Sequence, residues 1–157
     1  MSRSEPELSL AAVAPTLASI FGLPTLRDAS AAPLEGVCSS LGRRDCLALI
    51  LLDSFGVALW ENAGRLTPYF NGLAEKHLLR LQSVQPTVTP VCFATLASGA
   101  LPEVHQVRDR RDELRAQTIF HLLRQAGLKS AVAGRDSSSA RILLSRFADY
   151  ARVAASN

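Results

Sequence analysis

The feature that most restricts what this sequence can fold into is an unbroken apolar run at residues 47–52, which ends at Asp53. Its residues, Leu-Ala-Leu-Ile-Leu-Leu, do not alternate with polar ones, which is typical of a strand buried on both faces in a parallel sheet. A carboxylate where such a strand ends lies at the carboxyl edge of the sheet, where open α/β folds bind ligands. The run therefore predicts an α/β fold with Asp53 in a candidate site, although an Asp there also serves as an ordinary turn former.

A second candidate position is Thr89, which is followed by Pro90 and by an apolar stretch that ends at Gly99. This pattern predicts a helix with Thr89 as its N-cap, Pro90 at its first position and Gly99 just beyond its last. The hydroxyl group would then face the positive end of a helix dipole, where phosphate oxygens bind readily. Taken alone, a threonine in this position is more often a simple cap than a catalytic group.

Apolar periodicity predicts the other elements. A helix is expected over residues 8–24, a second one from Thr67, and a third from about Thr118 to Ala126, stopped by Gly127. Residues 78–85 and 129–133 are predicted strands, residues 142–144 fit either strand or helix, and residues 25–44 are predicted to be a surface connection. Because alternating strands and helices imply parallel pairing, Asp53 and Thr89 are expected to lie close together at one sheet edge.

Three sequence pieces, in order, carry a family resemblance. They are Leu-Ile-Leu-Leu-Asp-Ser-Phe-Gly at 49–56, Thr-Pro-Tyr-Phe-Asn-Gly-Leu-Ala at 67–74, and Pro-Thr-Val-Thr-Pro at 86–90, which continues to Pro-Glu-Val-His at 102–105. They resemble the first strand with its metal-binding Asp, a following helix, and the nucleophile segment of the alkaline phosphatase superfamily. The closest likeness is to its type I phosphodiesterase/nucleotide pyrophosphatase branch, and it covers roughly residues 47–136.

The resemblance implies a three-layer α/β sandwich with a mostly parallel sheet, alkaline phosphatase-like and partial, in which residues 1–157 form one partial domain around a core at 47–136. It also implies a metal-dependent phosphoesterase or phosphodiesterase. By this resemblance Thr89 is the catalytic nucleophile, Asp53 and Thr89 are metal ligands, and the cofactors are two divalent ions, zinc or manganese. The implied substrate is a phosphate ester or a nucleotide-like small molecule.

The sequence also departs from the family pattern. Gln106 stands where the family has a Gly after the turn histidine, His105, and the charged stretch 107–110 stands where the nucleotide-cleaving branch has an Asn. The family's other ligands, two Asp and three His, belong to a later half. His77, His105 and His121 are not expected to replace them, and His105 is expected to be structural. This chain alone is therefore expected to bind at most one metal ion, weakly, and to be inactive by itself.

Two interpretations of that incomplete ligand set stay open. The chain is either the nucleophile-bearing part of a longer enzyme or a degenerate form that serves as a non-catalytic α/β binding or assembly module. The segment Ala14-Pro15-Thr16-Leu17, with Gly22-Leu23-Pro24, resembles a helix that in the family follows the catalytic core, whereas here it precedes it. A dinucleotide-binding domain and a serine hydrolase are disfavoured, because the sequence has neither a GxGxxG nor a GxSxG motif.

Composition limits the partners and the compartment. Apolar residues make up 48% and charged residues 20% of the chain, which is typical of a globular protein. The formal charge is only +3 and basic residues are interleaved with acidic ones, so no nucleic-acid partner is expected. Cys38, Cys46 and Cys92 form no CxxC pair, which favours free thiols in a reducing compartment.

No apolar run is long enough for a membrane span, and Pro15 together with acidic residues near the start argues against a signal peptide. We therefore expect a soluble, cytoplasmic protein with no membrane partner. A sheet with only three expected strands leaves an edge unpaired, so self-association through the sheet is also expected.

Overall fold

The structure, a computed structural model, describes residues 8–135 and 137–154. It is a mixed α/β arrangement that is mostly helical and contains a two-stranded parallel sheet. The chain divides into two compact units. The first unit consists of the described residues up to Asp45 and from Leu81 onward, and the second unit is Cys46–Arg80. Each unit is considered by itself.

The first unit opens with a short 3-10 helix, η1 (Leu10–Ala12), that runs directly into α1 (Val13–Ile20), so the predicted helix in this region is confirmed. Gly22, at a φ of 66°, ends it. The segment predicted to be a surface connection contains an additional helix, α2 (Glu35–Leu41), none of whose residues is buried. The hydroxyl of Thr16 accepts a hydrogen bond from the Leu34 N–H at 2.8 Å, which fastens the connection to α1.

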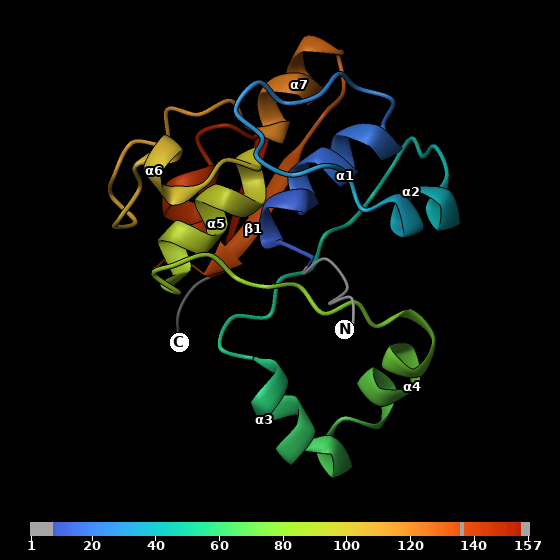
Figure 1. Ribbon diagram of the computed structural model, residues 1–157. Helices are drawn as coiled ribbons and strands as arrows, with labels where there is room; N and C mark the ends of the chain where they lie inside the picture. The colour runs from blue at the N-terminus through green and yellow to red at the C-terminus, as the bar shows by residue number, and fades with distance from the viewer. Residues whose placement is uncertain (1–7, 136, 155–157) are drawn as a thin grey trace, which may run out of the picture. The chain divides into compact units, whose positions relative to one another are not determined.

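Helix α5 (Thr89–Ser98) is the centre of the first unit (Figure 1). Gly99 follows it with a φ of 71° and a ψ of 0°, the left-handed conformation expected of a glycine beyond a helix end. The structure places Val88 rather than Thr89 at the N-cap, and Thr89 is the first helical residue. The predicted helix is therefore confirmed, and its start is shifted by one residue, which is within the usual scatter of helix ends.

The rest of the first unit follows as α6 (Pro102–His105), α7 (Ile119–Gln125), β1 (Ala131–Arg135), the π-helical turn η3 (Ala140–Leu144) and β2 (Tyr150–Ala154). The predicted helix starting near Thr118 and the predicted strand near residue 131 are both present. Residues 142–144, which fitted strand or helix, lie in η3. Strands β1 and β2 are parallel, with Ala131 paired to Tyr150, and η3 forms part of the connection that a parallel pair requires.

Two apolar clusters stabilise the first unit. The first joins the buried face of α5 to the segment after α6 and to η3, through Ala94, Ala97, Val107, Leu143 and Leu144. The second joins α1 to α7, through Ala14, Ala18, Leu26, Ile119 and Leu122. The small side chains of α1 and α5 allow their backbones to approach closely, and the sequence Ala-Pro-Thr-Leu thus forms part of the core.

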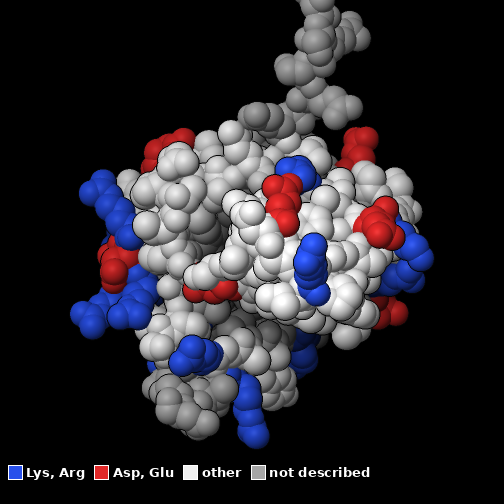
Figure 2. Space-filling view, turned by 90° about the horizontal axis from the view of Figure 1, so that it is seen from below, with Lys and Arg blue, Asp and Glu red and all other residues white. Residues whose placement is uncertain are grey.

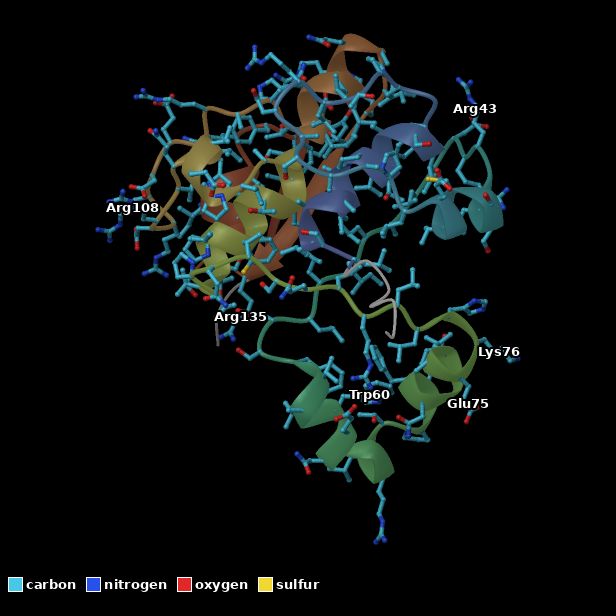
Figure 3. All side chains as sticks on the ribbon, viewed as in Figure 1. Arg43, Trp60, Glu75, Lys76, Arg108 and Arg135 are labelled. Atoms are coloured by element: carbon cyan, nitrogen blue, oxygen red, sulfur yellow. The ribbon has the colours of Figure 1, made fainter. Side chains whose placement is uncertain are left out.

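The second unit contains α3 (Val57–Asn62), the 3-10 helix η2 (Gly64–Leu66) and α4 (Pro68–His77). Trp60 belongs to α3 and its side chain contacts α4 (Figure 3). Its indole N–H donates to Asn71 Oδ1 at 2.7 Å, and Asn71 Nδ2 donates to the Gly64 carbonyl at 2.7 Å. Phe70 packs edge-on against both Phe55 and Trp60. These contacts hold the helices together, yet no residue of Cys46–Arg80 is buried.

The predicted strand at residues 47–52 is wrong for this structure. These residues form neither helix nor strand, and Ile50 is 80% exposed. The predicted strand at 78–85 is also wrong, apart from one isolated bridge between Gln82 and Ser9. An apolar run becomes a buried strand only when neighbours pair with its edges and cover its faces. The described residues supply only two strands, β1 and β2, and these pair with each other.

Surface charge is mixed, as the interleaved sequence predicts. In Figure 2, Lys and Arg side chains lie among Asp and Glu side chains. Arg27–Asp28, Arg80–Glu61, Arg115–Glu113 and Lys129–Asp149 form ion pairs. Across residues 8–135 and 137–154, every helix is too short or too polar to serve as a membrane span.

Candidate functional site

Thr89 stands at the positive end of the centrally placed helix α5. It is half-buried, whereas the residues on its N-terminal side, from Gln85 to Val88, are exposed. The side chain of the N-cap residue, Val88, makes no capping hydrogen bond. The N-terminus of a helix of ten residues favours anions, because its first N–H groups have no partner within the helix. The position suits an oxygen that attacks, or lies beside, a phosphoryl group.

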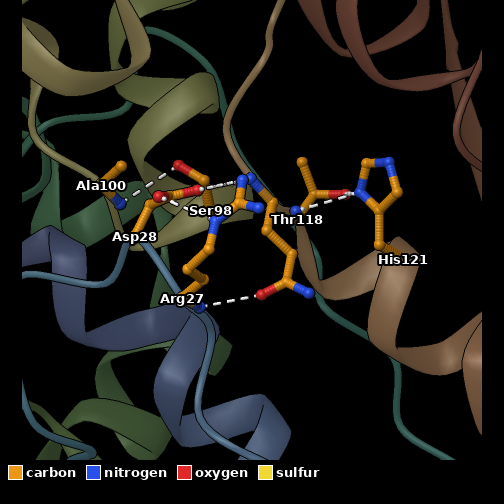
Figure 4. Close-up of polar contacts among 7 residues, drawn as sticks. Arg27, Asp28, Ser98, Ala100, Thr118 and His121 are labelled. Atoms are coloured by element: carbon orange, nitrogen blue, oxygen red, sulfur yellow. Dashed lines mark hydrogen bonds and ion pairs between the residues drawn. The ribbon is translucent and has the colours of Figure 1, made fainter.

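The far end of α5 is fixed by hydrogen bonds of two serines, Ser30 and Ser98. The carbonyl oxygen of Gly99 accepts hydrogen bonds from both the N–H and the hydroxyl of Ser30, at 2.9 Å and 3.0 Å. Ser98 Oγ donates to the Ala94 carbonyl at 2.7 Å. It also accepts from the Ala100 N–H at 3.1 Å (Figure 4). With Val91, Ala94, Thr95 and Ala97 also buried, the helix is rigidly seated in the first unit.

Asp53 lies in a turn of the second unit. Its Oδ1 accepts a hydrogen bond from the Ser54 N–H at 2.9 Å, and Ser54 has a φ of 60°. This is the turn-forming role that the sequence left open for an Asp in this position. Asp53 is in the second unit and Thr89 in the first, so their approach to one another stays a prediction.

His105 is buried, with a relative exposure of 1%, in the turn that follows α5. Its Nδ1 accepts a hydrogen bond from the Val107 N–H at 3.0 Å, so the proton of the neutral ring is on Nε2, 3.1 Å from Thr95 Oγ1. Burial lowers the pKa of His105 below its ordinary value, which favours the neutral ring. Both nitrogens are occupied by protein groups, which fits a structural histidine and leaves neither for a metal ion.

The residue after His105 is Gln106, which has a φ of 57°, in the left-handed region. The family resemblance places a Gly here, and the backbone explains why a Gly suits the position. The departure from the family pattern therefore costs stability.

The charged loop after Gln106 is closed by Asp112. Its Oδ2 accepts from the N–H groups of Arg108 and Asp109 at 2.7 Å and 2.8 Å, and these two bonds lower the pKa of Asp112. Arg110 donates to the Ser137 carbonyl at 3.0 Å. Arg108 points away from the rest of the chain (Figure 3). The loop thus shows the features of a solvated turn rather than a convergent anion site.

The described residues do not fit the pair of divalent ions that the family resemblance implies. No group of three or more His, Cys, Asp or Glu side chains within them is arranged to hold a metal ion. Asp53 and Thr89 remain the two oxygen donors suggested by resemblance.

The hydrogen bonds at the start of α7 were not predicted from the sequence. Thr118 and His121 form a capping box at the start of α7, with a histidine where Glu or Gln is usual. Gln117, one residue earlier, accepts from the Arg27 N–H at 2.8 Å and donates its own N–H to Asp28 Oδ2 at 2.9 Å. The spacing Thr-x-x-His, a variant of the capping box, is a sequence signal for the contact between Thr118 and His121. No sequence signal indicates the contacts of Gln117 with Arg27 and Asp28.

Comparison with protein families gives one match. The model described as type I phosphodiesterase/nucleotide pyrophosphatase matches residues 47–130, which includes Asp53, Thr89 and His105. No curated protein and no solved structure matches the chain.

Proposed function

Because the chain belongs to the type I phosphodiesterase/nucleotide pyrophosphatase family, we propose that it acts on phosphate esters or phosphodiesters, with Thr89 as the nucleophile. The observation that supports this role is the position of Thr89, half-buried at the N-terminus of a helix whose other end is fixed in the core. The three-layer alkaline phosphatase-like sandwich, of which this chain holds a part, belongs to the same proposal.

In the proposed reaction the Oγ of Thr89 attacks phosphorus. The Oγ–P bond forms, the P–O bond to the leaving group breaks, and the hydroxyl proton ends on the released alcohol. Water then hydrolyses the phosphorylated threonine. The first turn of α5 would stabilise the negative phosphoryl oxygens, because the helix dipole is positive there.

Asp53 and Thr89 are proposed as ligands of a divalent ion, zinc or manganese, by resemblance. A catalytic zinc ion keeps three protein ligands and an open position. Since the described residues offer no such group, no step is assigned to a metal ion here. We expect the 157-residue chain alone to turn over slowly or not at all.

The test is a labelling experiment rather than a rate measurement alone. The purified chain is incubated with bis(p-nitrophenyl) phosphate and zinc or manganese, and both nitrophenolate release and the mass of the peptide containing Thr89 are measured. We expect at most slow release and a phosphoryl adduct on Thr89. Thr89→Ala should lose the adduct, and Thr89→Ser should keep part of it.

Thr87→Ala is a matched control, because Thr87 is an exposed threonine two residues away. An adduct that persists in Thr89→Ala, or that is absent from the unmodified chain, would reject the role of Thr89. Rapid turnover that requires Thr89 would instead reject the incomplete metal site.

The second candidate function is a non-catalytic binding or assembly module, and the lack of a three-ligand cluster among the described residues favours it. Orthovanadate, a phosphoryl mimic, separates the two. Shifts of the Thr89 and Val91 amide signals in NMR spectra, lost in Thr89→Ala, support a phosphoryl site. Unchanged spectra with both vanadate and metal ions support the module.

A further inference from the structure

Helix α7 begins with a hydrogen-bonded pair that contains a titratable ring. The N–H of Thr118 lies 3.1 Å from Nδ1 of His121, and the Thr118 hydroxyl lies 2.8 Å from the same nitrogen (Figure 4). Thr118 is fully buried, with a relative exposure of 0%. A capping box ordinarily has Glu or Gln at this position, and neither changes its role near neutral pH as a histidine does.

The backbone bond fixes the tautomer of the ring. Because Nδ1 accepts the Thr118 N–H, it carries no proton, and the proton of the neutral ring is on Nε2. Protonation adds a hydrogen to Nδ1, which can then donate to the Thr118 hydroxyl but can no longer accept from the Thr118 N–H. The buried N–H of Thr118 loses its acceptor, which is costly inside a protein.

The surroundings of His121 also disfavour protonation of its ring. Burial is the main cause that lowers the pKa of His121, and the guanidinium groups of Arg124, on the same helix, and Arg27, on the segment after α1, lower it further. Arg27 is paired with Asp28, the nearest acidic group on that segment. Helices α1 and α5, which also pack against α7, contribute no charged side chain.

The remaining neighbour is aromatic. The ring of His121 lies 5.1 Å from the ring of Phe147, and the guanidinium of Arg146 lies 5.0 Å from the same phenyl ring. A protonated His121 would therefore place a second cation beside the phenyl ring of Phe147, which the guanidinium of Arg146 already contacts.

The capping box is also connected to a distant part of the chain. Gln117, directly before Thr118, is joined by two hydrogen bonds to Arg27 and Asp28, ninety and eighty-nine residues away in sequence. A change in the backbone at Thr118 is thus transmitted to the contact between α7 and the segment that follows α1.

We propose that His121 is an acid-sensitive cap, whose protonation opens the first turn of α7 and loosens the joint between Gln117 and the Arg27–Asp28 segment. The device is independent of the proposed function, because it involves neither Thr89 nor Asp53. In neutral solution the cap is closed, and in acid the N-terminal segment of the first unit is held less firmly.

The experiment uses NMR on the whole chain between about pH 7.5 and about pH 4.5. Nitrogen shifts of the His121 ring report the tautomer, and amide hydrogen exchange of Gln117 and Thr118, normalised for the intrinsic rate, reports opening. We expect an Nε2–H tautomer at neutral pH. We also expect protection of these two amides to fall about fivefold to thirtyfold as the ring protonates. The amides of α5 serve as the reference for global unfolding.

His121→Gln keeps an acceptor at the same place, so the two amides should stay protected throughout the pH range relative to α5. His77→Gln is the control, because His77 is exposed in the second unit, and it should retain the acid-induced loss. A proton on Nδ1 at neutral pH would overturn the proposal. So would an equal loss in His121→Gln, or a loss that is the same in α5.

Discussion

Nε2 of His105 lies 3.1 Å from Oγ1 of Thr95, and both side chains are buried. The contact joins the last residue of α6 to the middle of α5. Because Nδ1 of the same ring accepts from the Val107 N–H, the histidine must donate through one nitrogen and accept through the other. Only the neutral ring satisfies both bonds.

Thr95→Val removes the acceptor for the Nε2–H of His105 while keeping the side-chain shape. We expect the free energy of unfolding to fall by about 1–3 kcal/mol, the cost of a buried donor without a partner. Thr95→Ser, which retains the hydroxyl, should lose distinctly less. Denaturant unfolding of the three proteins gives the comparison, and a loss in Thr95→Val no larger than the loss in Thr95→Ser would contradict the role given to this hydrogen bond.

Stability should fall in acid because of His105. Its pKa in the folded protein is lowered by burial relative to an ordinary value of about 6.5, so the unfolded chain binds the proton more readily. The stability that His105 contributes as a neutral ring is fully present at pH values above the ordinary pKa. It is lost as the pH falls toward and through the lowered pKa of the folded protein. The free energy of unfolding, measured at a series of pH values, should decline less steeply in His105→Gln, and an unchanged slope would contradict this assignment.

Gln106→Gly should stabilise the protein. Gln106 is exposed and has a φ of 57°, where an L side chain is strained. Relief of that strain exceeds the extra entropy of glycine in the unfolded chain, so we expect a gain of about 0.5–1 kcal/mol in thermal or denaturant unfolding. Gln125→Gly, also at an exposed glutamine but in α7, should lose a similar amount.

Gly99 and Gly127 allow strain and close packing to be separated. Their φ angles are nearly equal, 71° and 73°, but a Cβ on Gly99 would lie 3.0 Å from Pro15 Cδ and 3.1 Å from the Ala11 carbonyl oxygen. A Cβ on Gly127 meets nothing within 4 Å. Gly127→Ala should therefore cost about 1–2 kcal/mol from strain alone, and Gly99→Ala about 1–3 kcal/mol more.

The second unit should be the least protected part of the chain. None of its residues is buried, and most of the exposed large apolar side chains belong to it, including Ile50 and Leu66 at 80% and 83% exposure. Amides of α3 and α4 should exchange far faster than those of α5. We also expect the chain to self-associate, visible as concentration-dependent sedimentation. A monomer at all concentrations with slowly exchanging α3 and α4 amides would contradict both expectations.

Local signals predicted α1, α4, α5 and α7, because the ends of these helices depend on nearby residues, but they did not predict α2 or α3. The pair Pro90 and Gly99 locates α5, and Thr118 with Gly127 locates α7, since proline geometry, capping and left-handed glycine act within a turn. Strands are different, because a strand exists only where another pairs with it. The run at 47–52 predicts burial that no described strand supplies, so its sequence indicates family membership and not its conformation here.

Around the candidate site, too, local features could be predicted from the sequence and distant contacts could not. The helix start beside Thr89 follows from three adjacent residues, and the buried turn of His105 agrees with the structural role suggested by resemblance. The acceptor role of His121 is local, because its partner Thr118 lies three residues earlier, and the spacing Thr-x-x-His indicates it. The pairing of Asp28 with Gln117 depends on a tertiary contact, which composition and spacing do not encode.

The hydrogen bonds between the Arg27–Ser30 segment and the ends of α5 and α7 bear on how the chain is made. Ser30 bonds to Gly99, 69 residues later, and Arg27 to Gln117, 90 residues later. At a synthesis rate of about 5–20 residues per second, the N-terminal helix emerges roughly 5–20 s before its last partner exists. Throughout that interval the apolar face of α1 is without the α7 side chains that cover it. Nascent chains stalled before Gly99 should therefore recruit chaperones through α1, and those stalled well after Gln117 should release them.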